Sequence, residues 1–326
     1  MKRILISFAL LAPIVLAACA SGSGPGPTPQ PTEIRLPMGF VANVHFAPWY
    51  VALEKGYFAD ESIELTFDYG WETDGVRLVG SGELPFAIAS GDQVILARSQ
   101  GLPVTTITNW FRRFPVSIVA LAESGIEQPS DLAGRRVGIP ETFGASYIGW
   151  RALAAQHGLG EGDVQLEVIG YTQLANLIEG RIDAAVVYAN NEPVQLEQMG
   201  HQFVEFLVAE DVALVSNGII ANETILEEKP ELVRAFIRAF LRGVRDTLDD
   251  PEMAFDICMN YVEGLEDNVE IQRAVLNATI PYWAAERLGE SEQEAWKNTV
   301  AVMESTALLQ QPPELDEMFT NAFLPE

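Results

Sequence analysis

The sequence predicts an α/β protein that folds into two lobes. Short β-rich runs alternate with amphipathic helical runs from Glu33 onward, and this alternation starts again near residue 117 before the chain ends in a long helical region. Alternation of strands with helices is typical of mainly parallel sheets that carry helices on both faces. Ligands of such sheets bind at the carboxyl ends of the strands, so we expect a binding cleft between the lobes.

We assign residues 33–116 plus 218–326 to lobe 1 and residues 117–217 to lobe 2. The chain would then cross between the lobes at two hinges, near residues 109–117 and near residues 214–219. Closure of the lobes about such hinges is the motion expected when a ligand enters the cleft.

The elements of lobe 1 follow from periodicity and from turn residues. Residues 62–67 alternate between polar and apolar, as a half-buried strand does, whereas residues 85–90 form an apolar run typical of a buried strand. Gly56 and the sequence Gly101-Leu102-Pro103 are helix stops. The expected strands are Ile34–Phe40, Ser62–Phe67, Pro85–Ser90 and Val104–Thr108, and the expected helices are Pro48–Tyr57, Asp74–Gly80 and Asp92–Gln100.

The same signals predict the elements of lobe 2 and of the helical tail. Gly158 and Gly200 each follow a helical run and end it. The expected strands are Ser117–Leu121, Arg136–Ile139, Val164–Ile169, Asp183–Tyr188, Phe203–Leu207 and Val215–Ala221. The expected helices are Ser146–His157, Thr172–Gly180, Pro193–Met199, Thr224–Thr247, Met253–Met259, Asn268–Ile280 and Glu292–Thr306, with a last piece near Leu315–Phe323.

The composition excludes several classes of function. The 326 residues include 46 acidic and 20 basic ones, giving a net charge of −26, whereas a protein that binds a nucleic-acid backbone needs a basic face. Two cysteines and three scattered histidines make a disulfide framework or a His/Cys metal site improbable, and we expect neither a metal nor a cofactor. The chain contains no G-x-S-x-G, P-loop, H-E-x-x-H or C-x-x-C motif, so no catalytic apparatus is visible.

Residues 1–18 are typical of a secretory leader. Lys2 and Arg3 precede an apolar run, Ile4–Ala18, that is shorter than the roughly 20 residues of a membrane-spanning helix. The run ends in Leu16-Ala17-Ala18-Cys19, which resembles the bacterial lipobox and predicts lipidation of Cys19; the alternative is a soluble secreted protein. Residues 19–32 then form a Pro/Gly-rich tether. We therefore expect an extracytoplasmic protein, periplasmic or on the outer face of the cell, held to the membrane by a lipid anchor.

Aromatic residues gather at the carboxyl-terminal turns of the predicted strands, where the cleft is expected. Aromatic side chains in cores usually lie inside strands or on one helical face, so a group at the strand ends predicts a slot that stacks a planar ring. Any one of these aromatic residues alone could equally be a core residue that packs and does not bind a ligand. The set is Phe40, Trp49, Tyr50, Trp71, Trp110, Phe111, Phe143, Tyr147 and Tyr188.

Polar residues at the same level would bind the polar edge of the ring. They are Asn43, Ser90, Asp92, Gln93, Thr142, Asn190, Asn191 and Glu192. Ser90 or Asp92 could instead cap a helix, and Glu192 could serve only as a partner of a helix dipole. In the cleft, however, the Glu192 carboxylate could accept from ring N–H or amino groups.

Arg112 and Arg113 form the adjacent basic pair near the expected cleft. They could grip a phosphate or a carboxylate, but a solvated position at the hinge is favoured. The predicted site is otherwise poor in cations, which favours a neutral ligand.

Several segments between Ile34 and Pro325 resemble the bacterial extracytoplasmic solute-binding proteins related to thiamine-pyrimidine synthases and precursor-binding proteins. Residues 40–58, F-V-A-N-V-H-F-A-P-W-Y-V-A-L-E-K-G-Y-F, are similar to the family pattern W-x-P-N…Y-V-A-x-x-x-G-Y-F. Further similar segments are Ser81–Ser90, Asp131–Pro140, Glu179–Tyr188 followed by Glu192, and Phe319–Pro325.

The resemblance implies a two-lobe periplasmic-binding-protein fold, type II-like, and roles for four residues. Asn43 and Tyr50 match the opening motif, and Phe40 stands where that motif has Trp. Glu192 matches the acidic residue that the precursor binders direct at an aminopyrimidine.

The resemblance also implies a monomeric substrate-binding component of an ABC importer, which passes its ligand to a membrane permease driven by an ATPase. The family spans binders of thiamine precursors, of riboflavin and, more distantly, of sulfonates and nitrate. We favour riboflavin, because the aromatic count suits a tricyclic ring and residues 91–110 most resemble the riboflavin-uptake members. Formylaminopyrimidine is the alternative.

Two other classes remain as rivals. A pyrimidine-synthase-like enzyme needs a cysteine-rich iron-binding segment and a reactive histidine, and the chain lacks such a segment. A sensory or structural lipoprotein is the third possibility.

Overall fold

Residues 30–325 are described by the computed structural model. The predicted leader over residues 1–18, the lipidated Cys19 and the tether as far as residue 29 lie outside the described residues. Within residues 30–325, none of the helices combines the length and the apolar character needed to cross a membrane.

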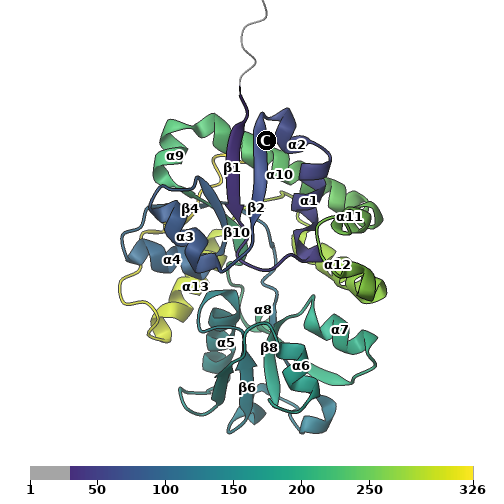
Figure 1. Ribbon diagram of the computed structural model, residues 1–326. Coiled ribbons are helices and arrows are strands. Elements are labelled where there is room, and N and C mark those ends of the chain that lie inside the picture. Colours follow the sequence, from purple (N-terminus) through teal and green to yellow (C-terminus); the bar gives the residue numbers. More distant parts are fainter. Residues whose placement is uncertain (1–29, 326) are drawn as a thin grey trace, which may run out of the picture. The chain divides into compact units, whose positions relative to one another are not determined.

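Lobe 1 is built around five strands. They are β1 (Thr32–Pro37), β2 (Ile63–Asp68), β3 (Phe86–Ser90), β4 (Val104–Asn109) and β10 (Asn217–Asn222). β1 and β2 pair in parallel (Figure 1), whereas β10 lies between β3 and β4 and runs antiparallel to both. β1 also packs beside β3, so the two hydrogen-bonded groups of strands are neighbours.

Lobe 2 is built around one five-stranded sheet. Its strands are β5 (Val116–Leu121), β6 (Arg136–Ile139), β7 (Gln165–Val168), β8 (Ala184–Tyr188) and β9 (Phe203–Leu207), in the order β7-β6-β8-β5-β9. β6 pairs in parallel with β7 and β8, whereas β5 runs antiparallel to β8 and β9.

The expectation of mainly parallel sheets is wrong, because β10 runs antiparallel to β3 and β4 in lobe 1 and β5 runs antiparallel to β8 and β9 in lobe 2. The two strands that run against their neighbours are β5 and β10, and each is the first strand after a crossing between the lobes. A chain that enters a lobe from the cleft must run away from the cleft, whereas the other strands run toward it. The two-lobe α/β class itself is confirmed.

Fourteen α-helices are found in the described range, besides four short 3₁₀ turns, and η1, the turn that leads into α1, is given with them. Those of the first part are η1 (Val44–Phe46), α1 (Ala47–Glu54), α2 (Tyr57–Asp60), α3 (Glu72–Gly80), α4 (Gly91–Ser99), α5 (Gly144–Gln156), α6 (Gln173–Ile178) and α7 (Glu192–Gln198). The rest are α8 (Val208–Asp211), α9 (Glu223–Glu228), α10 (Pro230–Asp249), α11 (Pro251–Cys258), α12 (Val269–Trp283), α13 (Gln293–Ser305) and α14 (Leu315–Met318).

Three predicted helices end or break earlier than expected. The helix expected over 48–57 ends at Glu54, because Gly56 takes a left-handed conformation with φ of 74°. The helix expected over 224–247 breaks at Lys229, whose backbone leaves the helical conformation with φ of −134° and ψ of 51°, since the residue before a proline disfavours that conformation. The last piece ends at Met318, after which the backbone is extended.

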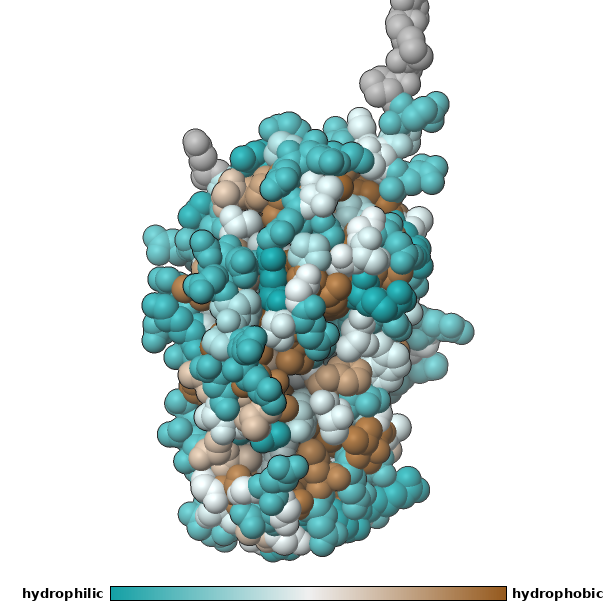
Figure 2. Space-filling model, turned by 90° about the vertical axis from the view of Figure 1, so that its left-hand side faces the viewer, coloured by the Kyte–Doolittle hydropathy of each residue, from teal (hydrophilic) through white to brown (hydrophobic). Residues whose placement is uncertain are grey.

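The surface is mostly polar outside the core. On the face shown in Figure 2, hydrophilic side chains predominate and hydrophobic ones form separate patches. A net charge of −26 on such a surface is explained by solvation and requires no partner.

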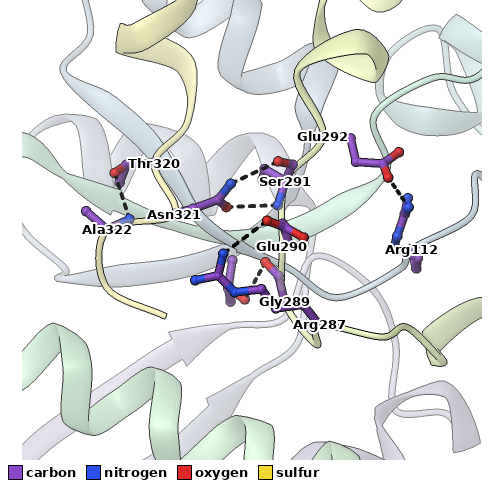
Figure 3. Close-up of polar contacts among 10 residues, drawn as sticks. Arg112, Arg287, Gly289, Glu290, Ser291, Glu292, Thr320, Asn321 and Ala322 are labelled. Atoms are coloured by element: carbon purple, nitrogen blue, oxygen red, sulfur yellow. Dashed lines mark hydrogen bonds and ion pairs between the residues drawn. The ribbon is translucent and has the colours of Figure 1, made fainter. Parts of the chain in front are cut away.

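The first crossing is braced by the segment that joins α12 to α13. The backbone N–H of Asn109 donates to the Gly289 carbonyl at 2.8 Å, and the N–H of Arg112 donates to the Tyr282 carbonyl at 2.7 Å. The Arg112 guanidinium forms an ion pair with Glu292 (Figure 3). The helical tail therefore fixes the strand end from which the chain enters lobe 2.

Candidate functional site

A cavity of about 530 Å³ lies between the two lobes. Its wall comes from the turns that follow β1, β2 and β4 in lobe 1 and β6, β7 and β8 in lobe 2, which are carboxyl-terminal strand ends. The volume is within the range of roughly 300–1,000 Å³ that holds a drug-sized ligand. The cleft is thus where the sheet topology places a binding site.

Four aromatic side chains from both lobes meet at the outer part of the cavity wall. Trp71 of lobe 1 stacks on Tyr171 of lobe 2, with ring centroids 5.1 Å apart and planes 28° apart. Phe40 contacts Tyr171 edge-to-face at 4.5 Å, and Phe143 contacts Trp71 edge-to-face at 5.9 Å. Trp71 and Tyr171 remain 38% and 40% exposed, so they can contact both solvent and a ligand.

A second aromatic group forms the inner wall and is buried. Phe46 stacks on Trp110 at 5.1 Å, and Trp110 packs against Phe111. Phe111 in turn contacts Tyr188 edge-to-face at 6.3 Å, which joins lobe 1 to lobe 2. These rings are held by the core behind them, so the inner wall is a rigid apolar surface.

Glu192 forms a polar end of the cavity. Its carboxylate accepts the backbone N–H of Tyr188 and the side-chain amide of Asn191, both at 3.1 Å. Burial raises the pKa of Glu192 to about 7. The neighbouring Tyr188 hydroxyl donates to the Asn217 side-chain oxygen at 3.1 Å, which brings β8 of lobe 2 to β10 of lobe 1.

Glu72 forms a second buried acidic group. It accepts the Ser90 backbone N–H at 2.9 Å and the Ser90 hydroxyl at 3.1 Å. Burial and the nearby Asp92 carboxyl raise the pKa of Glu72, and burial also raises the pKa of Asp92. One Asp92 oxygen accepts from the Gln93 amide at 2.9 Å, and the other has no hydrogen-bond partner among the described residues.

Among the described residues, the lining carries carboxyl groups and no side chain that is a cation near neutral pH, because burial lowers the pKa of His45 to about 4. Glu72, Glu141 and Glu192 line the cavity, and the lining within residues 30–325 includes no Lys or Arg. Arg112 is bound to Glu292 at the crossing, and Arg113 lies over the Tyr282 ring at 5.7 Å.

Within residues 30–325, no cluster of His, Cys, Asp and Glu is arranged to hold a metal ion. The cavity therefore favours an uncharged or cationic ligand.

Comparison with known proteins identifies the family. A model of the family described as NMT1/THI5 like matches residues 43–254, which is well over half of the chain. The chain belongs to the NMT1/THI5 like family. The match includes the wall residues from Asn43 to Asn217.

Relatives of this NMT1/THI5 like protein include both binders and enzymes. It is 38% identical to the riboflavin-binding protein RibY of Chloroflexus aurantiacus, over 90% of this chain and 86% of the relative. It is 28% identical to the formylaminopyrimidine-binding protein of Halalkalibacterium halodurans, over 98% and 99%. It is 25% identical to a 4-amino-5-hydroxymethyl-2-methylpyrimidine phosphate synthase of Legionella pneumophila, over 90% and 93%.

Solved structures share the fold of this NMT1/THI5 like protein at low identity. The periplasmic aliphatic sulphonate binding protein SsuA of Escherichia coli superimposes with a TM-score of 0.71 at 12% identity, over 90% of this chain and 99% of that one. This similarity confirms the two-lobe solute-binding fold.

Within this family fold, the structure brings nine of the predicted residues into the cavity wall. They are Phe40, Asn43, Trp71, Trp110, Phe111, Phe143, Tyr188, Asn191 and Glu192. The Asn43 side chain also accepts the His45 N–H at 2.9 Å, so it shapes the η1 turn as well as the wall.

Trp49 and Tyr50 lie outside the wall, in the core of lobe 1. Trp49 stacks on Phe240 at 4.0 Å, and Tyr50 stacks on Tyr261 at 4.5 Å; both are completely buried. The reason is the η1 turn, which comes between the strand end and α1 and turns α1 toward α10. We leave both residues out of the proposed contacts.

Six further predicted residues also lie outside the wall. Ser90, Asp92 and Gln93 are buried, with Ser90 donating to Glu72 and Gln93 donating to Asp92. Thr142 is exposed on the loop after β6, and the Tyr147 hydroxyl accepts from Arg151 at 3.0 Å. Asn190, the neighbour of Asn191, is buried and donates to Thr279.

Sequence reasoning missed several residues of the wall. They include His45, Phe46, Glu72, Tyr171, Gln195 and Asn217. Tyr171 follows β7 closely, so the rule used for the other strand ends would have found it. Asn217 begins β10, and the antiparallel direction of β10 brings its amino end to the cleft, which no rule for carboxyl ends anticipates.

Proposed function

We propose that this protein is the lipid-anchored substrate-binding component of an ABC importer and that it captures a planar, uncharged heterocycle, riboflavin first of all. One observation carries the proposal: aromatic rings from both lobes line a cleft that contains three carboxyl groups and no cation among its described residues. Such a wall stacks a flat ring and binds its N–H groups through the carboxylates.

The size of the cavity favours riboflavin. Riboflavin has more than twice as many non-hydrogen atoms as formylaminopyrimidine, and a cavity of about 530 Å³ would leave much of its volume to water around the smaller ligand. The 38% identity with a riboflavin-binding protein supports the same choice.

Formylaminopyrimidine remains the second candidate because of Glu192. A carboxylate held by the Tyr188 N–H and the Asn191 amide is well placed to accept from the amino group of an aminopyrimidine. The relative named for this ligand matches nearly the whole chain.

The mechanism we propose is closure of the lobes around the ligand, followed by delivery to a permease that an ATPase drives. No bond is made or broken. The enzymatic alternative, which the similarity to a synthase raises, requires a cysteine-rich segment, whereas the sequence contains only Cys19 and Cys258. Cys258 is buried in α11, and burial raises the pKa of its thiol to about 12.

The test is a titration of the chain that begins at Ala20 with riboflavin and, separately, with formylaminopyrimidine. Quenching of flavin emission at submicromolar ligand, or a yellow colour of the purified protein, would establish riboflavin. A change in tryptophan fluorescence with the pyrimidine alone would establish the second candidate. No response to either would refute both ligands.

Matched variants test whether the aromatic wall is the site. Trp71→Ala and Tyr171→Ala should each weaken binding about tenfold, because each removes a stacking contact of about 1–1.5 kcal/mol. Tyr147→Ala is the control, since Tyr147 is a half-buried tyrosine of lobe 2 outside the wall. Equal affinity of all three variants would refute this location.

A further inference from the structure

The carboxyl group of Glu72, in lobe 1, lies against the first residue of a helix of lobe 2. α5 begins at Gly144, and a Cβ atom placed on Gly144 would be 2.1 Å from a Glu72 carboxyl oxygen. Gly144 has a φ of 72°, a conformation that a residue with a side chain rarely adopts. A glycine at this position therefore permits the close approach of the two lobes.

The start of α5 is electropositive and has no side-chain cap. α5 has 13 residues, and Phe143, which precedes it, supplies no side-chain hydrogen bond to its first N–H groups. Unpaired N–H groups and the helix dipole make such a helix start a place where anions bind. It faces the cavity, because Gly144, Ala145 and Ser146 all line it.

Glu72 and Asp92 together supply negative charge at this position. Glu72 is 9% exposed and Asp92 is 4% exposed, and both carboxyls lie beside Ser90. The Gly144 backbone stabilises the ionised form of Asp92. Two buried carboxyls this close repel each other when both are ionised, so the pair loses its second proton less readily than its first.

We propose that Glu72, supported by Asp92, is a specificity-determining residue that fills the anion-binding position at the start of α5 and so excludes ligands that carry a phosphate, sulfonate or carboxylate. The inference rests on the proposed function in that the ligand enters this cavity. It deepens that function, because it predicts that the protein takes an uncharged heterocycle and rejects the phosphate ester of the same heterocycle.

The first experiment uses inorganic phosphate and therefore does not depend on the vitamin. The Glu72→Ala variant opens the start of α5, and phosphate at about ten times its dissociation constant should raise the unfolding midpoint by about 3 °C relative to NaCl of equal ionic strength. The native chain should show no such rise. Glu141→Ala is the control, since it removes another carboxyl from the cavity wall and leaves Glu72 in place.

The second experiment compares riboflavin with flavin mononucleotide. The native chain should prefer riboflavin by at least about tenfold, and Glu72→Ala should reduce that preference at least about tenfold. Glu72→Gln, which keeps the shape of the side chain and removes its charge, replaces Glu72→Ala if the smaller variant does not fold.

The outcomes separate the two proposals. If the native chain binds neither riboflavin nor flavin mononucleotide, the proposed ligand is wrong, and the phosphate experiment still decides the role of Glu72. An equal response of native and variant chains to phosphate would overturn the inference, as would flavin mononucleotide binding to the native chain as tightly as riboflavin.

Discussion

Glu192 is held by two hydrogen bonds in a cavity that closes around it, and burial raises the pKa of its carboxyl to about 7. Below pH 7 the Glu192 carboxyl is protonated, and a neutral carboxyl is a weak acceptor for a ligand N–H. Above pH 7 it is an ionised acceptor, and hydrogen bonds to an ionised acceptor are stronger than neutral ones. Ligand affinity should therefore depend on pH through the Glu192 carboxyl.

We predict that affinity rises by up to about tenfold between pH 6 and pH 8 and that Glu192→Gln removes this rise. The measurement is the dissociation constant across this pH range for the native chain and the variant. Glu197→Gln, which changes an exposed carboxyl on the same helix, is the control and should keep the pH dependence. A native affinity that does not change with pH would contradict the role given to Glu192.

At the scale of residues, the sequence predicted an aromatic cleft better than it predicted which individual side chains line that cleft. Rings at strand ends marked the cleft, and Trp71, Trp110 and Tyr188 do line it. Trp49 failed the same rule because its helix turns toward α10, a contact between residues far apart in the chain. Glu72 carried no signal, since in the sequence it is one acidic residue among 46.

At the scale of elements, α1 and α10 show why periodicity alone is insufficient. The two helices pack closely, and Gly243 of α10 lies at the point of contact. A Cβ atom on Gly243 would be 2.2 Å from the Pro48 carbonyl oxygen and 2.7 Å from the Ala52 Cβ. The glycine is thus needed for packing, although a glycine inside a helix costs stability.

We predict that Gly243→Ala lowers the free energy of unfolding by about 1–3 kcal/mol, because overpacking outweighs the gain of about 1 kcal/mol in helix propensity. Urea unfolding measures the change. Arg245→Ala, at an exposed position of the same helix, should change stability little. A stabilised Gly243→Ala variant would show that α1 and α10 can separate without loss.

Most elements could be predicted from the sequence because their signals are local. Gly101-Leu102-Pro103 and Gly158 mark helix ends that the structure confirms to within a residue or two. Strand direction is different, because it depends on where the chain re-enters a lobe. The reversed β5 and β10 could not be predicted from alternation alone.

At the scale of the whole molecule, two crossings join lobes that meet through Trp71 and Tyr171 at the outer wall and through Phe111 and Tyr188 at the inner wall. Opening must separate both pairs of rings, whereas the braced crossing near Arg112 can stay intact. The boundaries at residues 116–117 and 217–218 remain a proposal. Because each of the two ring pairs joins lobe 1 to lobe 2, ligand capture depends on both lobes.

The anchor can be tested separately from the cleft. We predict that Cys19→Ser moves the protein from the membrane fraction to the soluble extracytoplasmic fraction and leaves its affinity for the ligand unchanged, because the Pro/Gly-rich segment 20–29 separates Cys19 from the fold. Fractionation and a titration measure the two effects. Ser23→Ala is the control. Retention of Cys19→Ser in the membrane fraction would contradict lipidation at this residue.

The placement of β10 has a consequence for how the protein is made. β10 is the middle strand between β3 and β4, yet residues 110–216 must be synthesised before it exists. At about 5–20 residues per second, β3 and β4 wait roughly ten seconds for the strand that pairs with both. Until then each presents an unpaired edge, and such edges promote aggregation. A chain truncated before residue 217 would therefore be a source of aggregates and could not serve as a smaller binding protein.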